Sequence, residues 1–138
     1  MRYLRAGLVA GALMVALILP SAASAQINTF QIGSPAQLGP EGATVNVPVT
    51  INCEPGFEGG VDVFIRQAQG KRLIDGSGSA GVICTGENQT VIVVVQSGSG
   101  IRFKQGSAAA SASMFLFNPS TNRFTSARID PQAIRIVR

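Results

Sequence analysis

Hydrophobic and polar residues alternate one by one along several short stretches of this chain. The clearest stretch is Thr44–Cys53, in which every odd-numbered residue is apolar. Alternation with a period of two predicts a β-strand with one buried face, and Cys53 falls on that face. Pro48 has no backbone N–H to give to a neighbouring strand, so we expect a sheet edge or a bulge at this position.

The same pattern recurs downstream, with turns rich in Gly, Pro and Asn about every ten residues. In the stretch from Ser107 to Phe117, Ser111 and Ser113 mark one face, and the other face is apolar: Ala108, Ala110, Ala112, Met114 and Leu116. Thr90–Val95 is apolar on both faces, which predicts a central strand. No helical periodicity follows residue 25. These features predict an all-β fold, a sandwich or a barrel, and we expect an antiparallel β-sandwich of about 7 to 9 strands with one disulfide.

The first 25 residues differ from the rest. Two arginines near Met1 precede an apolar run that ends at Pro20, and small residues lead to Ala25. This order is typical of a secretory signal peptide cleaved after Ala25. We therefore expect residues 1–25 to be the signal and residues 26–138 to be one secreted, extracellular domain without a membrane span.

Removal of the signal also lowers the charge. Arg2 and Arg5 leave with it, so the formal net charge falls from +4 to +2. The basic residues that remain are interspersed with acidic ones along the sequence, whereas a protein that tracks nucleic-acid phosphates concentrates them. We expect no nucleic-acid partner.

Cys53 and Cys84 are the two cysteines of the chain. An even count in an exported chain predicts a disulfide, and closing a loop of this length stabilises a fold by roughly 3 to 4 kcal/mol. Two free buried thiols are the alternative.

Gly76, Gly78 and Gly81 have the G-x-G-x-x-G spacing of dinucleotide-binding proteins. That motif needs a helix after the glycines and an acidic residue about twenty positions later. Here Val82 and Ile83 follow, and no carboxylate lies near Val95. We therefore expect no nucleotide and interpret the glycines as a loop between two strands.

Catalysis is limited by the absence of histidine, which removes Ser–His and Cys–His pairs and imidazole metal sites. Glu54, Glu58 and Asp62 could form a carboxylate pair for glycoside hydrolysis or hold calcium, but solvated turn charges explain them more simply. We expect no enzymatic activity, no cofactor and no metal site.

Phe64, Phe115 and Phe117 occupy the polar side of their predicted strands. If they face outward, they form an apolar patch suited to a protein partner or to self-association. The alternative is that both faces of these strands are covered.

Three segments, Thr44–Cys53, Val82–Gly86 and Phe103–Ala108, resemble those of small exported immunoglobulin-like domains of Gram-positive bacteria, many of them uncharacterised. The resemblance implies an immunoglobulin-like β-sandwich, although the tryptophan that packs on the disulfide of antibody domains is missing. A fainter similarity is to neocarzinostatin-type carriers, which have two disulfides where this chain can form one.

These observations favour a non-catalytic binding or structural domain that contacts a protein or cell-surface partner. An extracellular carrier of a small apolar ligand is the first alternative, and a carboxylate-dependent hydrolase is the second.

Overall fold

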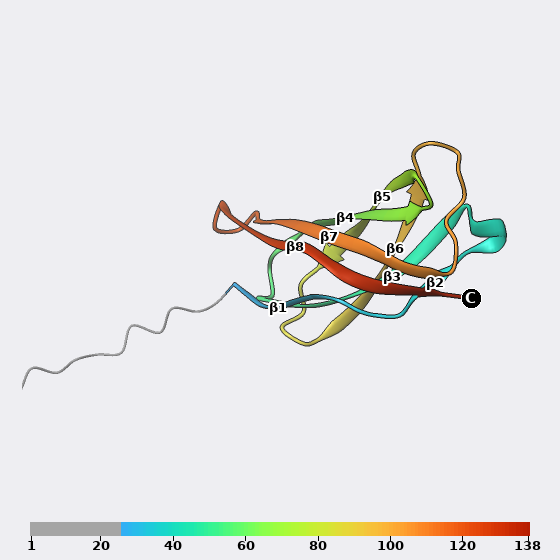
Figure 1. Ribbon diagram of the computed structural model, residues 1–138. Coiled ribbons are helices and arrows are strands. Elements are labelled where there is room, and N and C mark those ends of the chain that lie inside the picture. Colours follow the sequence, from blue (N-terminus) through green and yellow to red (C-terminus); the bar gives the residue numbers. More distant parts are fainter. Residues whose placement is uncertain (1–25) are drawn as a thin grey trace, which may run out of the picture.

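The computed structural model describes residues 26–138, which form one all-β unit (Figure 1). The predicted signal peptide lies outside these residues. The eight strands of residues 26–138 are β1 (Ile27–Ile32), β2 (Ala36–Leu38), β3 (Thr44–Cys53), β4 (Glu58–Gln69), β5 (Arg72–Ile83), β6 (Gln89–Ser97), β7 (Gly106–Asn118) and β8 (Arg123–Val137). A single 3₁₀ turn, Pro40–Gly42, joins β2 to β3. The prediction of an all-β fold is confirmed.

The expected immunoglobulin-like sandwich is not confirmed, because the strands close into a barrel. β3 pairs with β6 on one side and with β2 on the other, and the order then runs β2–β8–β7–β4–β5–β6. Seven strands form this ring, and β1 adds to β3 as an eighth. The pairing of β2 with β8 is parallel, whereas the sequence analysis expected antiparallel pairs alone. The closed barrel and its parallel pair depend on hydrogen bonds between strands that are distant in sequence. The alternation of residues along one strand does not specify those pairings, so the sequence did not predict them.

The core follows the alternation of β3 and β7. Odd-numbered residues of β3 from Val45 to Cys53 are fully buried, and Ala108, Ala110, Ala112, Met114 and Leu116 of β7 face the same interior. Phe57 and Phe103 are the largest side chains buried with them. Along this inward face of β7 the side chains are small from Ala108 to Ala112 and larger from Met114 to Leu116.

Pro48 lies where the partner of β3 changes. β1 ends opposite Val49, and β2 begins opposite Asn46. Between them Gly33 donates its N–H to the carbonyl of Pro48 at 2.7 Å. The missing N–H of Pro48 therefore falls at an interruption of the neighbouring strand, which is the edge-like environment that its chemistry requires.

The prediction that Thr90–Val95 forms a central strand is confirmed, because β6 has a paired strand on each edge, but only one of its faces is buried. β6 pairs with β3 along eight residues but with β5 at Gly76 and Ser77 alone. Val93 and Val95 are buried, while Ile92 and Val94 are about half exposed on the outside of the barrel. An apolar run therefore identifies a central strand here, although only one of the two faces of that strand is buried.

Cys53 and Cys84 form the predicted disulfide, with their Cα atoms 5.1 Å apart. It joins the end of β3 to the residue after β5. Two backbone hydrogen bonds reinforce this junction, from Cys84 to the carbonyl of Phe57 and from Gly86 to the carbonyl of Cys53. In residues 26–138 we find no helix with the length and apolar character that a membrane crossing needs.

Candidate functional site

The glycine motif lies inside a strand and not in the loop that the sequence analysis expected. β5 runs without a break from Arg72 to Ile83. A Cβ on Gly76 would meet the carbonyl oxygen of Gln96 at 2.6 Å, and one on Gly78 would collide with the carbonyl oxygen of Val94. The glycines allow β6 to cross closely over β5. No helix follows them, so the arrangement lacks the amide cluster that holds a pyrophosphate.

The three predicted patch residues point outward but do not form one cluster. Phe64 and Phe115 are each 56% exposed, and Phe117 is partly buried. Phe115 pairs with Gly60, which is four residues before Phe64 on β4. At roughly 3.3 Å per residue, Phe64 is displaced by about 13 Å along the strand.

A third phenylalanine joins Phe115 and Phe117 in place of Phe64. Phe124 is 59% exposed, and its ring centroid lies 4.5 Å from that of Phe117 and 5.5 Å from that of Phe115. We call Phe115, Phe117 and Phe124 the aromatic cluster. Offset or tilted ring pairs at these distances contribute about 0.5 to 1.5 kcal/mol beyond their buried area.

The β7–β8 turn creates the aromatic cluster. Asn118 is buried, and its side-chain oxygen accepts hydrogen bonds from the N–H groups of Ser120 and Thr121 at 3.0 and 3.4 Å. This turn sets a register in which Phe117 lies opposite Phe124. The Asn-Pro-Ser-Thr-Asn sequence was the signal that could have revealed Phe124, because a turn fixes which residues pair beyond it.

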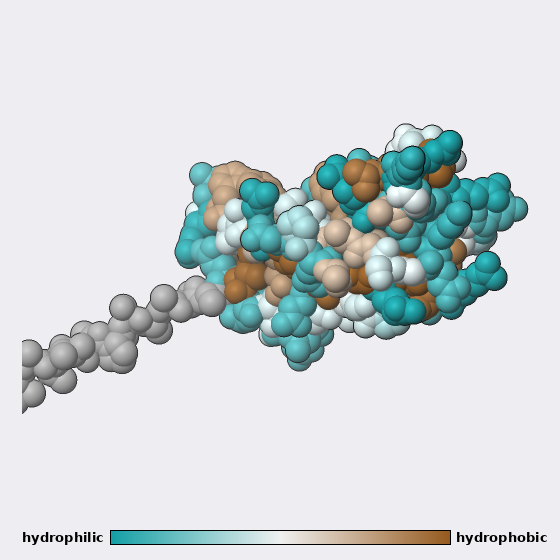
Figure 2. Space-filling model, viewed as in Figure 1, coloured by the Kyte–Doolittle hydropathy of each residue, from teal (hydrophilic) through white to brown (hydrophobic). Residues whose placement is uncertain are grey.

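Beside the aromatic cluster, two paired glycines leave the outer face of the sheet without side chains, so the surface is lower there. Gly60 of β4 pairs with Phe115 on one side and with Gly81 of β5 on the other. A Cβ on Gly81 would meet nothing within 4 Å, so this glycine leaves open space above the strand. We call the low surface over Gly60 and Gly81 the glycine shelf. Ile83, 72% exposed, follows Gly81 by two residues on β5, and Glu58 lies between Ile83 and Phe117. Apolar surface is visible near the β7–β8 hairpin, at the upper left of Figure 2.

Phe64 lies beside a separate open groove of about 510 Å³. Its lining includes Ala109, Ser111 and Pro131 together with an ion pair between Arg66 and Asp75. Arg66 donates two hydrogen bonds to the Asp75 carboxylate, at 2.7 and 3.3 Å. These bonds lower the pKa of Asp75 and raise the pKa of Arg66 from their ordinary values. Both side chains are more than half exposed, so the pair adds little to stability.

The carboxylates Glu54, Glu58 and Asp62 are not drawn together. Glu58 and Asp62 point outward from β4 four residues apart, which is about 13 Å along a strand. Glycosidase carboxylates lie about 5 to 9.5 Å apart. Asp62 instead accepts a hydrogen bond from the Ser79 hydroxyl. Within residues 26–138 no group of three or more Asp, Glu, Cys or His side chains is placed to hold a metal ion.

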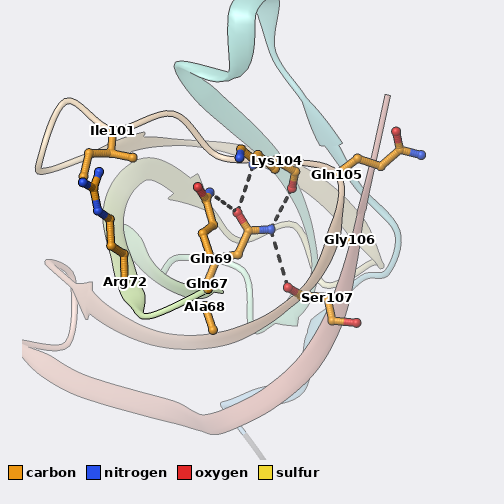
Figure 3. A pocket seen from close by; sticks show the side chains of 10 residues that line it. Gln67, Ala68, Gln69, Arg72, Ile101, Lys104, Gln105, Gly106 and Ser107 are labelled. Carbon is orange, nitrogen blue, oxygen red and sulfur yellow. Dashed lines mark hydrogen bonds between the residues drawn. The ribbon is translucent and has the colours of Figure 1, made fainter.

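A buried amide organises the opposite end of the barrel (Figure 3). Gln67 is only 3% exposed, and its amide bonds both backbone groups of Lys104: Nε2 donates to the carbonyl at 2.7 Å, and Oε1 accepts from the N–H at 2.9 Å. Oε1 also accepts a hydrogen bond from Gln69. The loop before β7 is thereby fastened to β4.

Comparison with known proteins places the chain in no established group, since neither a family model nor a curated protein matches it. The likeness to exported immunoglobulin-like domains therefore remains a hypothesis. What the structure defines is a single-disulfide β-barrel domain with an exposed aromatic cluster at one end and a clamped loop at the other.

Proposed function

We propose that this chain is an exported, non-catalytic binding domain that acts through contact with another protein, at the cell surface or in the surrounding medium. The leader-like residues 1–25 and the Cys53–Cys84 disulfide support a non-cytoplasmic location. The absence of histidine and the wide separation of Glu58 and Asp62 favour a binding role over a catalytic one.

The aromatic cluster beside the glycine shelf is the observation that carries this proposal. Burying an exposed phenylalanine contributes about 1.5 to 3 kcal/mol, and aromatic anchors commonly dominate the energy of protein interfaces. Phe115 and Phe124 rise at the edge of the low surface made by Gly60 and Gly81, with Ile83 beyond it. The partner that fits is a protein that presents an apolar surface together with a hydrogen-bond donor or cation for Glu58, which is exposed between Phe117 and Ile83.

The test uses the mature chain and a Phe115→Ser/Phe124→Ser variant. Leu73→Ser is the matched control, because Leu73 is 62% exposed but lies on β5 near the other end of the barrel. Each protein is used as bait against surface and medium fractions of the source cells, and captured proteins are then re-tested as purified components. Light scattering coupled to size-exclusion chromatography measures self-association in parallel.

We expect wild type and the Leu73→Ser control to bind the same purified partner and the double variant to lose at least about tenfold in affinity. A purified partner that binds all three proteins equally would remove the aromatic cluster from the proposal. Absence of any partner, with all three proteins monomeric, would contradict the proposal itself.

The Phe64 groove supports the carrier of a small apolar ligand as a second candidate function. The groove is open, holds about 510 Å³ and has Phe64, Ala109 and Pro131 in its lining. Native mass spectrometry of protein taken from its own medium separates the two candidates. A carrier arrives with added mass that Phe64→Ser removes, whereas a protein-contact domain arrives at the mass of the bare chain.

A further inference from the structure

The cations of the domain meet at one end of the barrel, although they are dispersed along the sequence. At this end lie the β4–β5 hairpin, the loop before β7 and the end of β8 (Figure 1). Six of the nine basic residues in 26–138 are found there, all exposed: Lys71, Arg72, Arg102, Lys104, Arg135 and Arg138. We call this set the basic end. Hydrophilic surface covers it at the right of Figure 2.

The basic end is weakly neutralised. Two acidic side chains lie near it: Glu41, whose carboxylate is 3.6 Å from Arg102, and Asp75, which follows Arg72 by three residues on β5 and is paired with Arg66. Three other carboxylates, Glu54, Glu58 and Glu87, follow β3, begin β4 and precede β6. Because β4 is twelve residues long, Glu58 is more than about 30 Å from the hairpin tip, beyond several Debye lengths at physiological salt. The field at the basic end is therefore positive.

Two grooves enter the basic end, one on each side of Lys104 and Gln105. The first holds about 580 Å³ and has Arg72 and Ser107 in its lining, and the second holds about 670 Å³ and includes Arg102 and Arg138. Lys104 and Gln105 line both. We call these two grooves, which share the loop as a common wall, the path; Glu41 also lines the second groove, where it is paired with Arg102.

Lys104 is held in place at the centre of this path. The Gln67 amide fixes the backbone N–H and carbonyl of Lys104, and it approaches the Ser107 carbonyl at 3.5 Å (Figure 3). Because the amide oxygen and nitrogen of a buried side chain both form hydrogen bonds to this loop, the loop is already ordered before a ligand binds. Less conformational entropy is then lost on binding. The basic end therefore combines charge, concave shape and a central lysine whose backbone is fixed.

We propose that the basic end binds a flexible linear polyanion, a polymer that carries an anionic group on successive repeats. An extended chain can follow the two grooves across Lys104, whereas a planar membrane surface cannot enter a concave path. A nucleic acid gains little here from its bases, because Phe103, the aromatic residue of the loop, is 2% exposed and closed to stacking. This surface is distinct from the aromatic cluster.

The test measures binding of the mature chain to end-labelled inorganic polyphosphate by fluorescence anisotropy at several salt concentrations. The variant Arg72→Glu/Lys104→Glu changes both grooves. The matched control is Arg123→Glu/Arg128→Glu, which makes the same charge change at exposed arginines of β8 away from the basic end. Thermal unfolding of all three proteins checks that the fold is retained.

We expect the basic-end variant to bind polyphosphate at least about tenfold more weakly than the control variant, with a shallower salt dependence that reflects about two lost phosphate contacts. Equal losses in the two variants would overturn the proposal, because binding would then follow net charge alone. Tighter binding to anionic phosphatidylglycerol vesicles or to single-stranded oligonucleotide, at equal phosphate concentration, would also overturn it.

Discussion

Gly78 in β5 lies directly against the carbonyl group of Val94 in β6, with no room between them for a Cβ atom. Two residues before it, Gly76 is in the same position relative to Gln96. β6 pairs with β3 from Gln89 to Gln96 and reaches β5 at Gln96 and Ser97, which closes the barrel. Gly76 and Gly78 of the motif thus allow the close approach of β5 and β6, whereas Gly81 lies in open space.

The glycine motif provides a matched pair of substitutions. Gly78→Ala should lower the free energy of unfolding by about 1 to 3 kcal/mol or more, because the new methyl group meets backbone that cannot move aside. Gly81→Ala enters open space at an ordinary backbone conformation, so it should be neutral or stabilise by up to about 1 kcal/mol. Urea denaturation of both variants measures the difference. Equal effects would show that the crossing is not tightly packed.

Gln67→Leu should destabilise the protein by about 2 to 3 kcal/mol, since it leaves the backbone groups of Lys104 without their buried partner. Hydrogen exchange at the Lys104 amide should become faster. Gln105→Leu serves as the control, because Gln105 is an exposed glutamine of the same loop and should change stability by less than about 0.5 kcal/mol. Unchanged exchange at Lys104 in the Gln67 variant would rule out the clamp.

Removal of the disulfide by Cys53→Ala/Cys84→Ala should cost about 3 to 4 kcal/mol, mainly through the greater entropy of the unfolded chain. The two cysteines are 31 residues apart. Equilibrium unfolding of the variant, compared with wild type before and after reduction, gives the value. Reduced wild type and the variant should agree within about 1 kcal/mol, and retention of full stability in both would contradict a structural role.

The Arg66–Asp75 pair predicts a specific pH dependence. Arg66 lowers the pKa of Asp75 by hydrogen bonding to its carboxylate. A carboxyl group whose pKa is lower in the folded state stabilises the fold above its unfolded pKa, and this contribution is lost as the pH falls through the folded value. An NMR titration should place the pKa of Asp75 below the ordinary value of about 3.9, and Arg66→Gln should return it there. An identical pKa in both proteins would exclude the pair in solution.

The sequence by itself determined the local structure and the chemical limits of this protein. Alternation along Thr44–Cys53 identified a strand whose odd-numbered side chains are all buried, and the two cysteines identified the disulfide. Alternation with a period of two is a property of neighbouring residues, and two cysteines allow only one pairing. Both patterns can therefore be interpreted without knowledge of the fold. The missing histidine likewise narrows the available chemistry wherever the strands lie.

Only the tertiary structure decided how these strands are joined and which side chains meet. Closure of the barrel depends on the β3–β6 and β2–β8 pairings, which link segments far apart in the chain. The register across the β7–β8 turn brings Phe124 to Phe117 and leaves Phe64 apart. Dispersed basic residues converge because hairpin, loop and final strand end at the same side of the barrel. Closure of the barrel and the meeting of the basic residues depend on hydrogen bonds between strands distant in sequence, and alternation along one strand carries no information about those partners. The register of the β7–β8 hairpin is local and follows from its turn.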